Sequence, residues 1–270
     1  MIVHHLNCIS TCPLGGRLMD GRTRSLAERG LLTCHCLLVE TSAGLVLVDT
    51  GFGTHEVTDP KATLDPLSRT LLKPLLDINE TAIYQVEKRG YGAEDVRHIL
   101  LTHLDLDHAG GLRDFPDATV HVLDTELESA TSPRNAKERA RYPKAQREGV
   151  TFQTHKAEGE DWFGFEAVRS IAGLPEDILM VPLIGHTRGH TGIAVKGEDG
   201  WLLHAGDAYF YRGEVETPPS NIFALKLTAK QTETIREQRL SNVERLKSLK
   251  ASGEAEVFCA HDPVELARLA

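Results

Sequence analysis

The sequence predicts an α/β fold built from mixed β-sheets. Short apolar, strand-like runs recur along the chain, and helix-like patterns or Gly-rich loops separate them. Interleaved strands and helices favour an α/β architecture, while one hairpin-like pair indicates that some neighbouring strands run antiparallel. The sequence contains no internal repeat and no Pro- or Ser-rich linker. We therefore expect residues 1–270 to form a single domain.

The first half of the chain predicts a hairpin followed by a helical region. Residues 37–39 and 45–48 flank the turn Thr41–Gly44, and the second strand runs into Asp49-Thr50-Gly51. Short strands are predicted at 99–101 and 120–122, and residues 124–148 are predicted to be mostly helical. Between 65 and 89 the apolar residues are spaced for one buried helix face; they are Leu71, Leu72, Leu75, Leu76, Ile83 and Val86.

The second half predicts four more strands, at 180–184, 193–195, 201–204 and 257–260. A long helix over 228–250 precedes the last of them, and Gly253 lies near its end, where glycine commonly ends helices. Its expected inward side chains are Ile235, Val243, Leu246 and Leu249.

Composition excludes several classes of protein. Of the 270 residues, 41% are hydrophobic and 26% are charged, as in ordinary globular proteins. No window of about 18 apolar residues predicts a transmembrane helix, and Met1–Pro13 lacks the basic leader and apolar run of a secretory signal. We therefore expect a cytoplasmic protein that does not engage a membrane.

The net charge of −9 disfavours a nucleic-acid binder, which needs a basic face to displace counterions from phosphates. The one basic stretch, Arg134–Arg147, has two interpretations. It is either a solvated helix or a lid that contacts an anionic group of a substrate.

The five cysteines are Cys8, Cys12, Cys34, Cys36 and Cys259. An odd number in a chain of this length argues against a disulfide framework. Cys34 and Cys36 have no second pair at zinc-finger spacing, so they make a poor thiolate site. We expect reduced, structural cysteines.

The strongest chemical signal is the segment Thr102–Gly111. It contains four metal-capable side chains within six residues, namely His103, Asp105, Asp107 and His108. The segment follows a predicted strand, and loops at the carboxyl ends of strands are a usual place for sites in α/β folds. Nitrogen and oxygen ligands of this kind suit Zn, Fe or Mn.

Three later segments repeat the arrangement with one side chain each. His186, Asp207 and His261 each come just after a predicted strand, where several strand ends can converge. Each signal is weak alone, but the four segments together predict one metal centre. We interpret His190 as a residue that supports a ligand, and the remaining histidines as structural; these are His4, His5, His35, His55, His98, His121, His155 and His204.

These motifs resemble those of the metallo-β-lactamase superfamily. That family carries H-x-H-x-D-H, a later His in a Gly-His-Thr-x-Gly-His segment, an Asp after a strand and a final His. The resemblance spans Leu37 to His261 and includes the Asp49-Thr50-Gly51 turn. It implies an αβ/βα sandwich of two mixed sheets flanked by helices, with metal ions at one edge.

The resemblance also implies roles for the residues. His103, Asp105 and His186 would hold one ion, and Asp107, His108 and His261 a second, with Asp207 bridging the two. Two zinc ions per chain would then activate a water molecule and polarise the substrate carbonyl. Asp107 would in addition orient that water or relay its proton.

One position departs from the family pattern, because Asp105 stands where the second His of the signature is expected. A carboxylate is a harder ligand than imidazole and shifts preference towards iron or manganese. Diiron flavoproteins of the same superfamily also carry a carboxylate at this position.

Fold and metal ligands alone do not choose a substrate. The stretch Val86–Val96, the chain length and the tyrosines after Asp207 are similar to quorum-quenching lactonases. In those enzymes a Tyr helps to bind the substrate carbonyl, which makes Tyr209 and Tyr211 catalytic candidates, with packing as the alternative. We therefore expect a hydrolase that opens lactones or cleaves carboxylic esters, acts on a small-molecule substrate and forms, if it associates, a homodimer.

Three alternatives stay open at this stage. A thioesterase of the glyoxalase II type usually has a basic C-terminal region, whereas residues 251–270 contain only Arg268. A diiron redox protein usually carries a flavodoxin-like domain, for which 270 residues leave no room. A metal sensor without turnover is the third.

Overall fold

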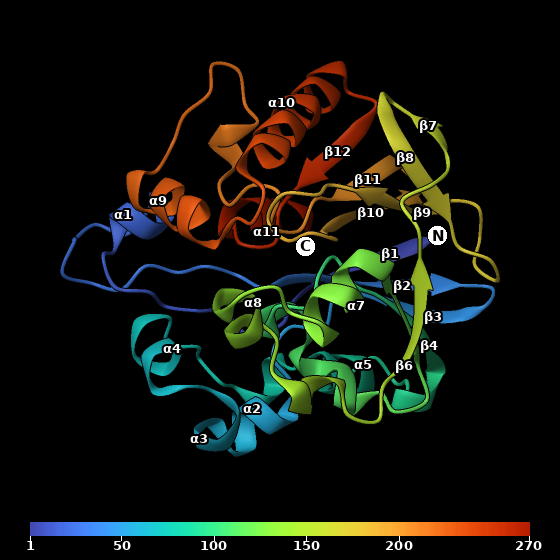
Figure 1. The fold of residues 1–270 in the computed structure, drawn as a ribbon, viewed down its shortest axis with the longest axis horizontal. Helices are drawn as coiled ribbons and strands as arrows, with labels where there is room; N and C mark the ends of the chain where they lie inside the picture. Colours follow the sequence, from blue (N-terminus) through green and yellow to red (C-terminus); the bar gives the residue numbers. More distant parts are fainter.

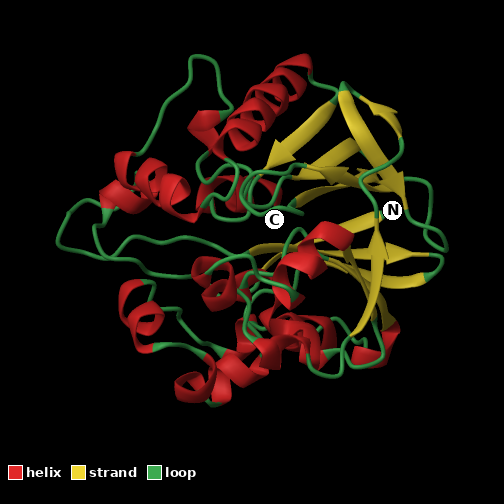
Figure 2. Ribbon diagram, in the orientation of Figure 1, coloured by secondary structure: helices red, strands yellow, loops and turns green.

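Two β-sheets lie face to face in the middle of the molecule, and helices cover the outer side of each (Figure 1, Figure 2). The computed structural model describes the backbone of residues 1–270 and every side chain outside 167–169. The strands are β1 (Ile2–Asn7), β2 (His35–Thr41), β3 (Gly44–Val48), β4 (Val96–Leu100), β5 (Thr119–Leu123), β6 (Thr151–His155), β7 (Glu160–Trp162), β8 (Phe165–Ser170), β9 (Ile178–Pro182), β10 (Thr191–Gly197), β11 (Gly200–His204) and β12 (Ala255–Phe258).

The helices are mostly short. They are α1 (Arg17–Asp20), α2 (Thr54–Thr58), α3 (Pro60–Thr63), α4 (Pro66–Leu71), α5 (Ala82–Glu87), α6 (Leu106–Ala109), α7 (Asp124–Thr131), α8 (Ala136–Arg141), α9 (Phe223–Thr232), α10 (Arg236–Ser252) and α11 (Pro263–Leu269). Figure 1 shows α10 over one sheet and α5 and α7 over the other.

Both sheets contain six strands and both are mixed, as the sequence predicts. The first has the order β1-β2-β3-β4-β5-β6, in which β1, β2 and β3 pair antiparallel and the rest parallel. The second has the order β12-β11-β10-β9-β8-β7, in which only β12 and β11 pair parallel. Strands β2 and β3 form the predicted hairpin.

A buried apolar layer joins the sheets. Val46 and Val48 of β3 belong to the same cluster as Ile193 and Val195 of β10, and all four are fully buried. Burial of each such side chain contributes roughly 1.5–3 kcal/mol. Separate clusters hold α5 and α7 on the outside of the first sheet and α10 on the outside of the second. The predicted αβ/βα sandwich is therefore the observed architecture.

The helical region predicted at 65–89 was wrong in its middle. Helix α4 ends at Leu71, and a helix resumes only at Ala82. Pro74 cannot donate to a helical hydrogen bond, and Lys73 and Leu76 on either side of it have positive φ. Leu71, Leu72 and Leu75 are consequently exposed, whereas Val86 is buried as predicted.

Two other predicted helices are also divided. The region 124–148 forms α7, α8 and a 3-10 turn at Lys144–Arg147, with Pro133 and Pro143 at the breaks. The region 228–250 contains the end of α9 and most of α10. Val243, Leu246 and Leu249 point inward as predicted, but Ile235 lies at the break and is half-buried.

The predictions omitted β1, β6, β7 and β8. Strand β1 is an edge strand that carries His4, His5 and Asn7, so its polar residues hide the signal. Strand β6 is the other edge of the first sheet and is mostly exposed. The five cysteines are free thiols, as expected. Within the described part of the chain, every helix is too short or too polar to cross a bilayer.

Candidate metal centre

Metal-capable side chains gather at one edge of the sandwich, beyond the ends of strands from both sheets. His103 and the short helix α6, which carries Asp107 and His108, follow β4 of the first sheet. The second sheet contributes residues that follow β9, β11 and β12, namely His186, Asp207 and His261. The seven predicted side chains form three overlapping groups, each with its ligand atoms within 4.8 Å of one another. The structure thus brings together the complete predicted set.

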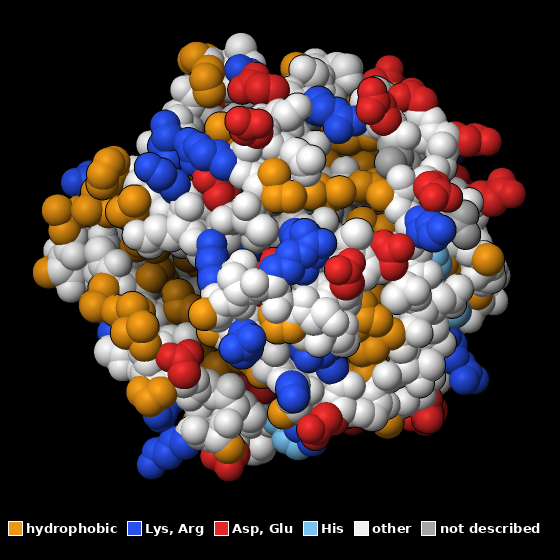
Figure 3. Space-filling view, in the orientation of Figure 1, with side chains coloured by type: hydrophobic (Ala, Val, Ile, Leu, Met, Phe, Trp, Pro, Cys, Tyr) orange, Lys and Arg blue, Asp and Glu red, His pale blue; other side chains and the backbone are white. Residues whose placement is uncertain are grey.

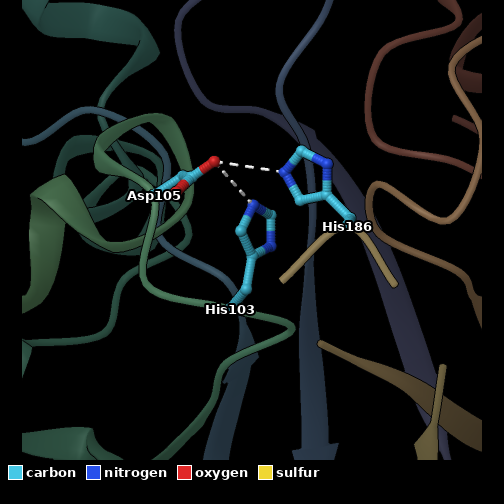
Figure 4. Close-up of side chains that lie close together, drawn as sticks. All are labelled: His103, Asp105 and His186. Atoms are coloured by element: carbon cyan, nitrogen blue, oxygen red, sulfur yellow. Dashed lines mark hydrogen bonds and ion pairs between the residues drawn. The ribbon is translucent and has the colours of Figure 1, made fainter. Parts of the chain in front are cut away.

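The first group contains His103, Asp105 and His186 (Figure 4). The Oδ2 atom of Asp105 lies 3.3 Å from Nε2 of His103 and 3.2 Å from Nε2 of His186. Figure 4 shows both rings directing a nitrogen towards this oxygen. Both histidines are buried.

Asp207 lies between two pairs of histidines in the centre, namely His103 with His186 and His108 with His261. Its Oδ2 is 3.4 Å from Nε2 of His186 and 3.8 Å from Nε2 of His103. Its Oδ1 is 3.0 Å from Nε2 of His261 and 3.3 Å from Nε2 of His108. The two oxygens therefore face different groups, which is the arrangement a bridging carboxylate needs.

Unpaired buried atoms indicate that the cluster suits a cation. Nε2 of His103, Nε2 of His108 and Oδ1 of Asp207 are buried and form no hydrogen bond. Buried polar atoms are normally satisfied, so nitrogen lone pairs and a carboxylate oxygen that converge without hydrogen bonds fit the ligand set of a divalent metal. The residues present fit the ion that the sequence predicts.

Hydrogen bonds on the outer side of the rings orient them. Nδ1 of His261 donates to the carbonyl of Thr33 at 2.7 Å, and Nδ1 of His108 is 2.8 Å from Oδ2 of Asp49. A partner on Nδ1 leaves Nε2 free to bind metal and raises its basicity. Sequence analysis noted Asp49 only as part of a turn motif.

Asp49 occupies a strained position at the end of β3. It has a φ of 55°, which is uncommon for a residue with a side chain. Besides His108, its carboxylate accepts from the amide and the hydroxyl of Thr102. Backbone strain of this kind persists where the surroundings fix it, often at functional sites. Here the contacts with Thr102 and His108 hold Asp49 in this conformation, and Asp49 in turn holds the loop that carries the H-x-D-x-D-H segment.

His190 supports the centre from behind. Its Nδ1 donates to the carbonyl of Leu183, and its Nε2 accepts from the amide of Asp207 at 2.9 Å. Both ring nitrogens are therefore used within the protein. This geometry matches the interpretation of His190 as a residue that positions Asp207.

On the other side of the centre lie Asp107, His108, Asp207 and His261, which we call the second group. Carboxylates dominate its electrostatics. Burial lowers the pKa of His261, but Asp207 and Asp107 outweigh it and raise that pKa to about 9. Burial likewise opposes the charged form of His108, whose pKa Asp207 and Asp49 nevertheless raise well above its ordinary value.

The first group differs because Arg141 enters it. The last residue of α8 forms a two-point ion pair with Asp105, at 2.5 Å and 2.7 Å. Burial, and next the Arg141 charge, lower the pKa of His186 to about 3. Arg141 thus faces the centre, whereas Arg134, Lys137 and Arg139 of the same basic stretch are exposed; both interpretations of the stretch stay predictions.

The tyrosine candidates lie elsewhere. Tyr209 is fully buried in the apolar cluster beneath β11 and β12, and its hydroxyl donates to Glu265 at 3.2 Å. This placement favours packing over substrate contact. Tyr211 is half-buried, and the guanidinium of Arg212 lies over its ring; a catalytic role for it stays a prediction.

Sequence analysis missed two other residues of the site. The Phe210 ring is stacked on His261, with ring centroids 5.5 Å apart. The buried carboxylate of Glu126 accepts from the amides of Leu104, next to His103, and Gly189, in the loop that carries His186. It thereby connects the two loops. No motif singled out either residue, since both depend on tertiary contacts.

The chain belongs to the metallo-beta-lactamase superfamily, whose sequence profile matches residues 29–261. Its relatives include a probable metallo-hydrolase of Mycobacterium tuberculosis, 38% identical over 97% of this chain and 80% of the relative. An N-acyl homoserine lactonase of Bacillus cereus is 25% identical over 84% of this chain and 80% of the relative.

Solved structures share the fold. An N-acyl homoserine lactone hydrolase of Bacillus thuringiensis with N-decanoyl-L-homoserine bound superposes with a TM-score of 0.73 at 19% identity, covering 98% of this chain and 95% of that one. A dizinc quorum-quenching lactonase superposes with a TM-score of 0.64 at 15% identity, covering 97% and 87%. The protein is therefore a metallo-hydrolase of this superfamily with a divalent metal site.

Proposed function

We propose that this protein hydrolyses carboxylic esters at the metal centre, with lactones as the preferred class. Relatives named as N-acyl homoserine lactonases support the proposal, since one covers 84% of this chain. The observation that carries it is a cavity beside the centre that is lined by charged residues of the centre and by apolar side chains.

The cavity has a volume of about 380 Å³, which suits a small molecule. Asp105, Asp107 and Arg141 of the centre line it, together with the charged Asp65 and Lys137. Its apolar lining residues include Phe52, Leu64, Leu72, Pro74 and Leu106. A molecule with a polar, hydrolysable head and an apolar tail matches this mixed lining.

Apolar side chains continue outside the cavity. Leu67, Leu71 and Leu75, in and just after α4, and Phe223 and Leu227 of α9 are all exposed. Figure 3 shows hydrophobic side chains on both sides of a hollow at this end of the molecule. Such a patch marks a binding surface, and an acyl chain would gain by packing there. A homodimer stays a prediction, which sedimentation would test.

A larger cavity, of about 740 Å³, is not the substrate site. Residues of β1, β11 and the start of β12 line it. Its lining includes none of the seven cluster residues.

When bound, a divalent ion supplies a Lewis acid that polarises an ester carbonyl and lowers the pKa of water to near 7. Asp107, His108, Asp207 and His261 would hold it. Asp107 is 27% exposed, lines the cavity and places Oδ2 3.8 Å from Nε2 of His261. It is positioned to hold the attacking water and pass its proton to the departing alkoxide, a role worth about 10²–10⁴ in rate.

A substrate panel tests the proposal. Purified protein with its metal content measured by mass spectrometry is given N-acyl homoserine lactones, simple lactones, aryl esters and S-acyl glutathione, and acid release is followed with a pH indicator. We expect saturable lactone opening that a chelator removes and added zinc, manganese or iron restores. Lactone rates at background would sink the lactonase assignment.

The panel also separates the nearest rivals. Faster cleavage of S-acyl glutathione than of any lactone would assign a thioesterase. A protein that binds metal but hydrolyses none of the substrates in the panel would be assigned as a sensor. Iron in the isolated protein, together with redox activity, would assign a diiron redox protein instead of a hydrolase. A cytoplasmic location stays a prediction, which fractionation of the producing cell would test.

A further inference from the structure

Arg141 occupies the part of the first group where a cation would bind. Its Nε and Nη2 atoms contact the two oxygens of Asp105, and Nη2 also lies 2.5 Å from Nε2 of His186. A guanidinium and a carboxylate that meet at two points form one of the strongest pairings available to side chains. One cation thus already uses Asp105 and the ligand atom of His186.

The guanidinium is fixed on its other side. Its Nη1 atom donates to the backbone carbonyls of His186, at 3.2 Å, and Thr232, at 2.9 Å. The Arg141 side chain is only 10% exposed. Arginine does not lose its proton in proteins, so this positive charge is permanent. Its position is fixed by contacts with a loop of each sheet and with the end of α9.

The second group has no equivalent cation. Among the ion pairs of the described residues, Asp107 and Asp207 pair only with histidines. Nε2 of His108 and Oδ1 of Asp207 are buried and lack hydrogen bonds, and in the first group the same holds for Nε2 of His103. Two of these three unpaired atoms therefore lie on this side of the centre, where no arginine or lysine pairs with the carboxylates.

We propose that Arg141 is the resident cation of the first group and that the protein binds one divalent ion, held by Asp107, His108, Asp207 and His261. The aspartate at position 105 then serves the arginine rather than a metal. This replaces the expectation of two ions that the family resemblance implies. It rests on the proposed function only in treating the cluster as a metal centre.

Metal stoichiometry tests the proposal without any substrate. The wild-type protein and the Arg141→Met variant are stripped, dialysed against excess zinc, passed over a desalting column and analysed by mass spectrometry. Methionine keeps much of the volume of arginine and removes its charge. We expect one ion per chain in the wild type and two in Arg141→Met, because the first group then has an unpaired carboxylate and two free imidazoles.

Two control variants sharpen the result. Lys137→Met removes a positive charge from the same helix and the same cavity wall, and it should leave one ion bound. Asp105→Asn should also leave one ion bound, since Asp105 is not a ligand in this arrangement. Two ions in the wild type, or loss of the single ion in Asp105→Asn, would overturn the proposal.

A double variant covers the case in which Arg141→Met does not fold. Asp105→His combined with Arg141→Met restores the family's histidine and removes the guanidinium, so it should bind two ions. Loaded with Mn²⁺, the wild type should give the electron paramagnetic resonance spectrum of an isolated ion, and the double variant that of a coupled pair. A coupled pair in the wild type would refute the proposal.

The stoichiometry and the substrate panel fail independently. A protein that binds one ion and opens no lactone keeps this inference and loses the proposed function. A protein that binds two ions and opens lactones does the reverse.

Discussion

Histidines gather in two kinds of place in this molecule, and the difference shows what makes a ligand. In the metal centre, His108 and His261 face carboxylates that raise their pKa. On the first sheet, His98, His121 and His155 lie side by side on β4, β5 and β6 and bond to one another at 2.9 Å and 3.0 Å. Burial and the neighbouring histidines lower the pKa of His121 to about 3.

A second row has the same character. Nδ1 of His5 lies 2.7 Å from Nε2 of His35, and His204 donates to the carbonyl of His35. Burial, followed by His204, lowers the pKa of His5 to about 4. Buried histidines are thus common to both regions. The centre is distinguished by carboxylates around the rings and, in His103 and His108, by an Nε2 atom that has no hydrogen bond while Nδ1 has a partner.

The largest expected effect is on turnover when a ligand of the centre is removed. His108→Ala should lower kcat/KM by more than about 10³-fold, because losing a ligand exceeds the 10–100-fold cost of losing a residue that only supports one. Metal content and hydrolysis are measured together, with circular dichroism to confirm folding. His55→Ala, at an exposed histidine outside the cluster, is the matched control. Equal losses in the two variants would mean that His108 is not a metal ligand.

A smaller effect is expected from Asp49→Asn. The variant keeps the shape of the side chain but weakens the carboxylate contact to Nδ1 of His108, so metal affinity should fall by about 10–100-fold. Competition with a chromophoric chelator measures it, and the exposed Asp117→Asn is the control. Unchanged affinity would mean that Asp49 stabilises the loop without tuning the ligand.

His190→Leu should have a lesser effect again. It removes the acceptor of the Asp207 amide, and we expect about 10-fold weaker metal affinity with nearly normal turnover for each ion bound. Titration with metal followed by assay at saturating metal separates the two quantities. If saturating metal failed to restore turnover, His190 would have a direct part in the chemistry.

The row on the first sheet should affect acid stability and not catalysis. His121 has a folded pKa of about 3 against an ordinary value of 6.5. Between these values the unfolded chain binds more protons, so stability is full above pH 6.5 and falls as pH drops towards 3. His121→Leu cannot take up that proton, so it should lose on the order of 3 kcal/mol less over this range.

Urea unfolding of both proteins at a series of pH values gives this difference directly. Parallel curves of unfolding free energy against pH would contradict the assignment. Turnover at neutral pH should be the same in both proteins.

The sequence was sufficient for the layers of the fold and for the set of metal-capable side chains that lie close together. Apolar runs such as 45–48 and 193–195 mark strands buried on both faces, and the motif spacing predicted which side chains converge. Prolines at positions 74, 133 and 143 divided helices that periodicity alone had joined. Edge strands such as β1 escaped because their polar residues weaken the alternation.

Contacts between distant segments were beyond a single sequence. Arg141 reaches Asp105 across 36 positions, and nothing in the basic stretch distinguishes it from its neighbours. Asp49 lies 59 positions from His108. The tyrosines after Asp207 were predicted from local similarity, but the structure directs the Tyr209 hydroxyl to Glu265.

The origin of the ligands in both sheets has a mechanical consequence. His108 follows a strand of the first sheet, whereas Asp207 and His261 follow strands of the second. An ion bound by all three would therefore link the two sheets. Metal affinity and the stability of the packing between the two sheets are then thermodynamically linked, so a change in one changes the other. A substitution in the apolar layer between the sheets, far from any ligand, would therefore lower metal affinity.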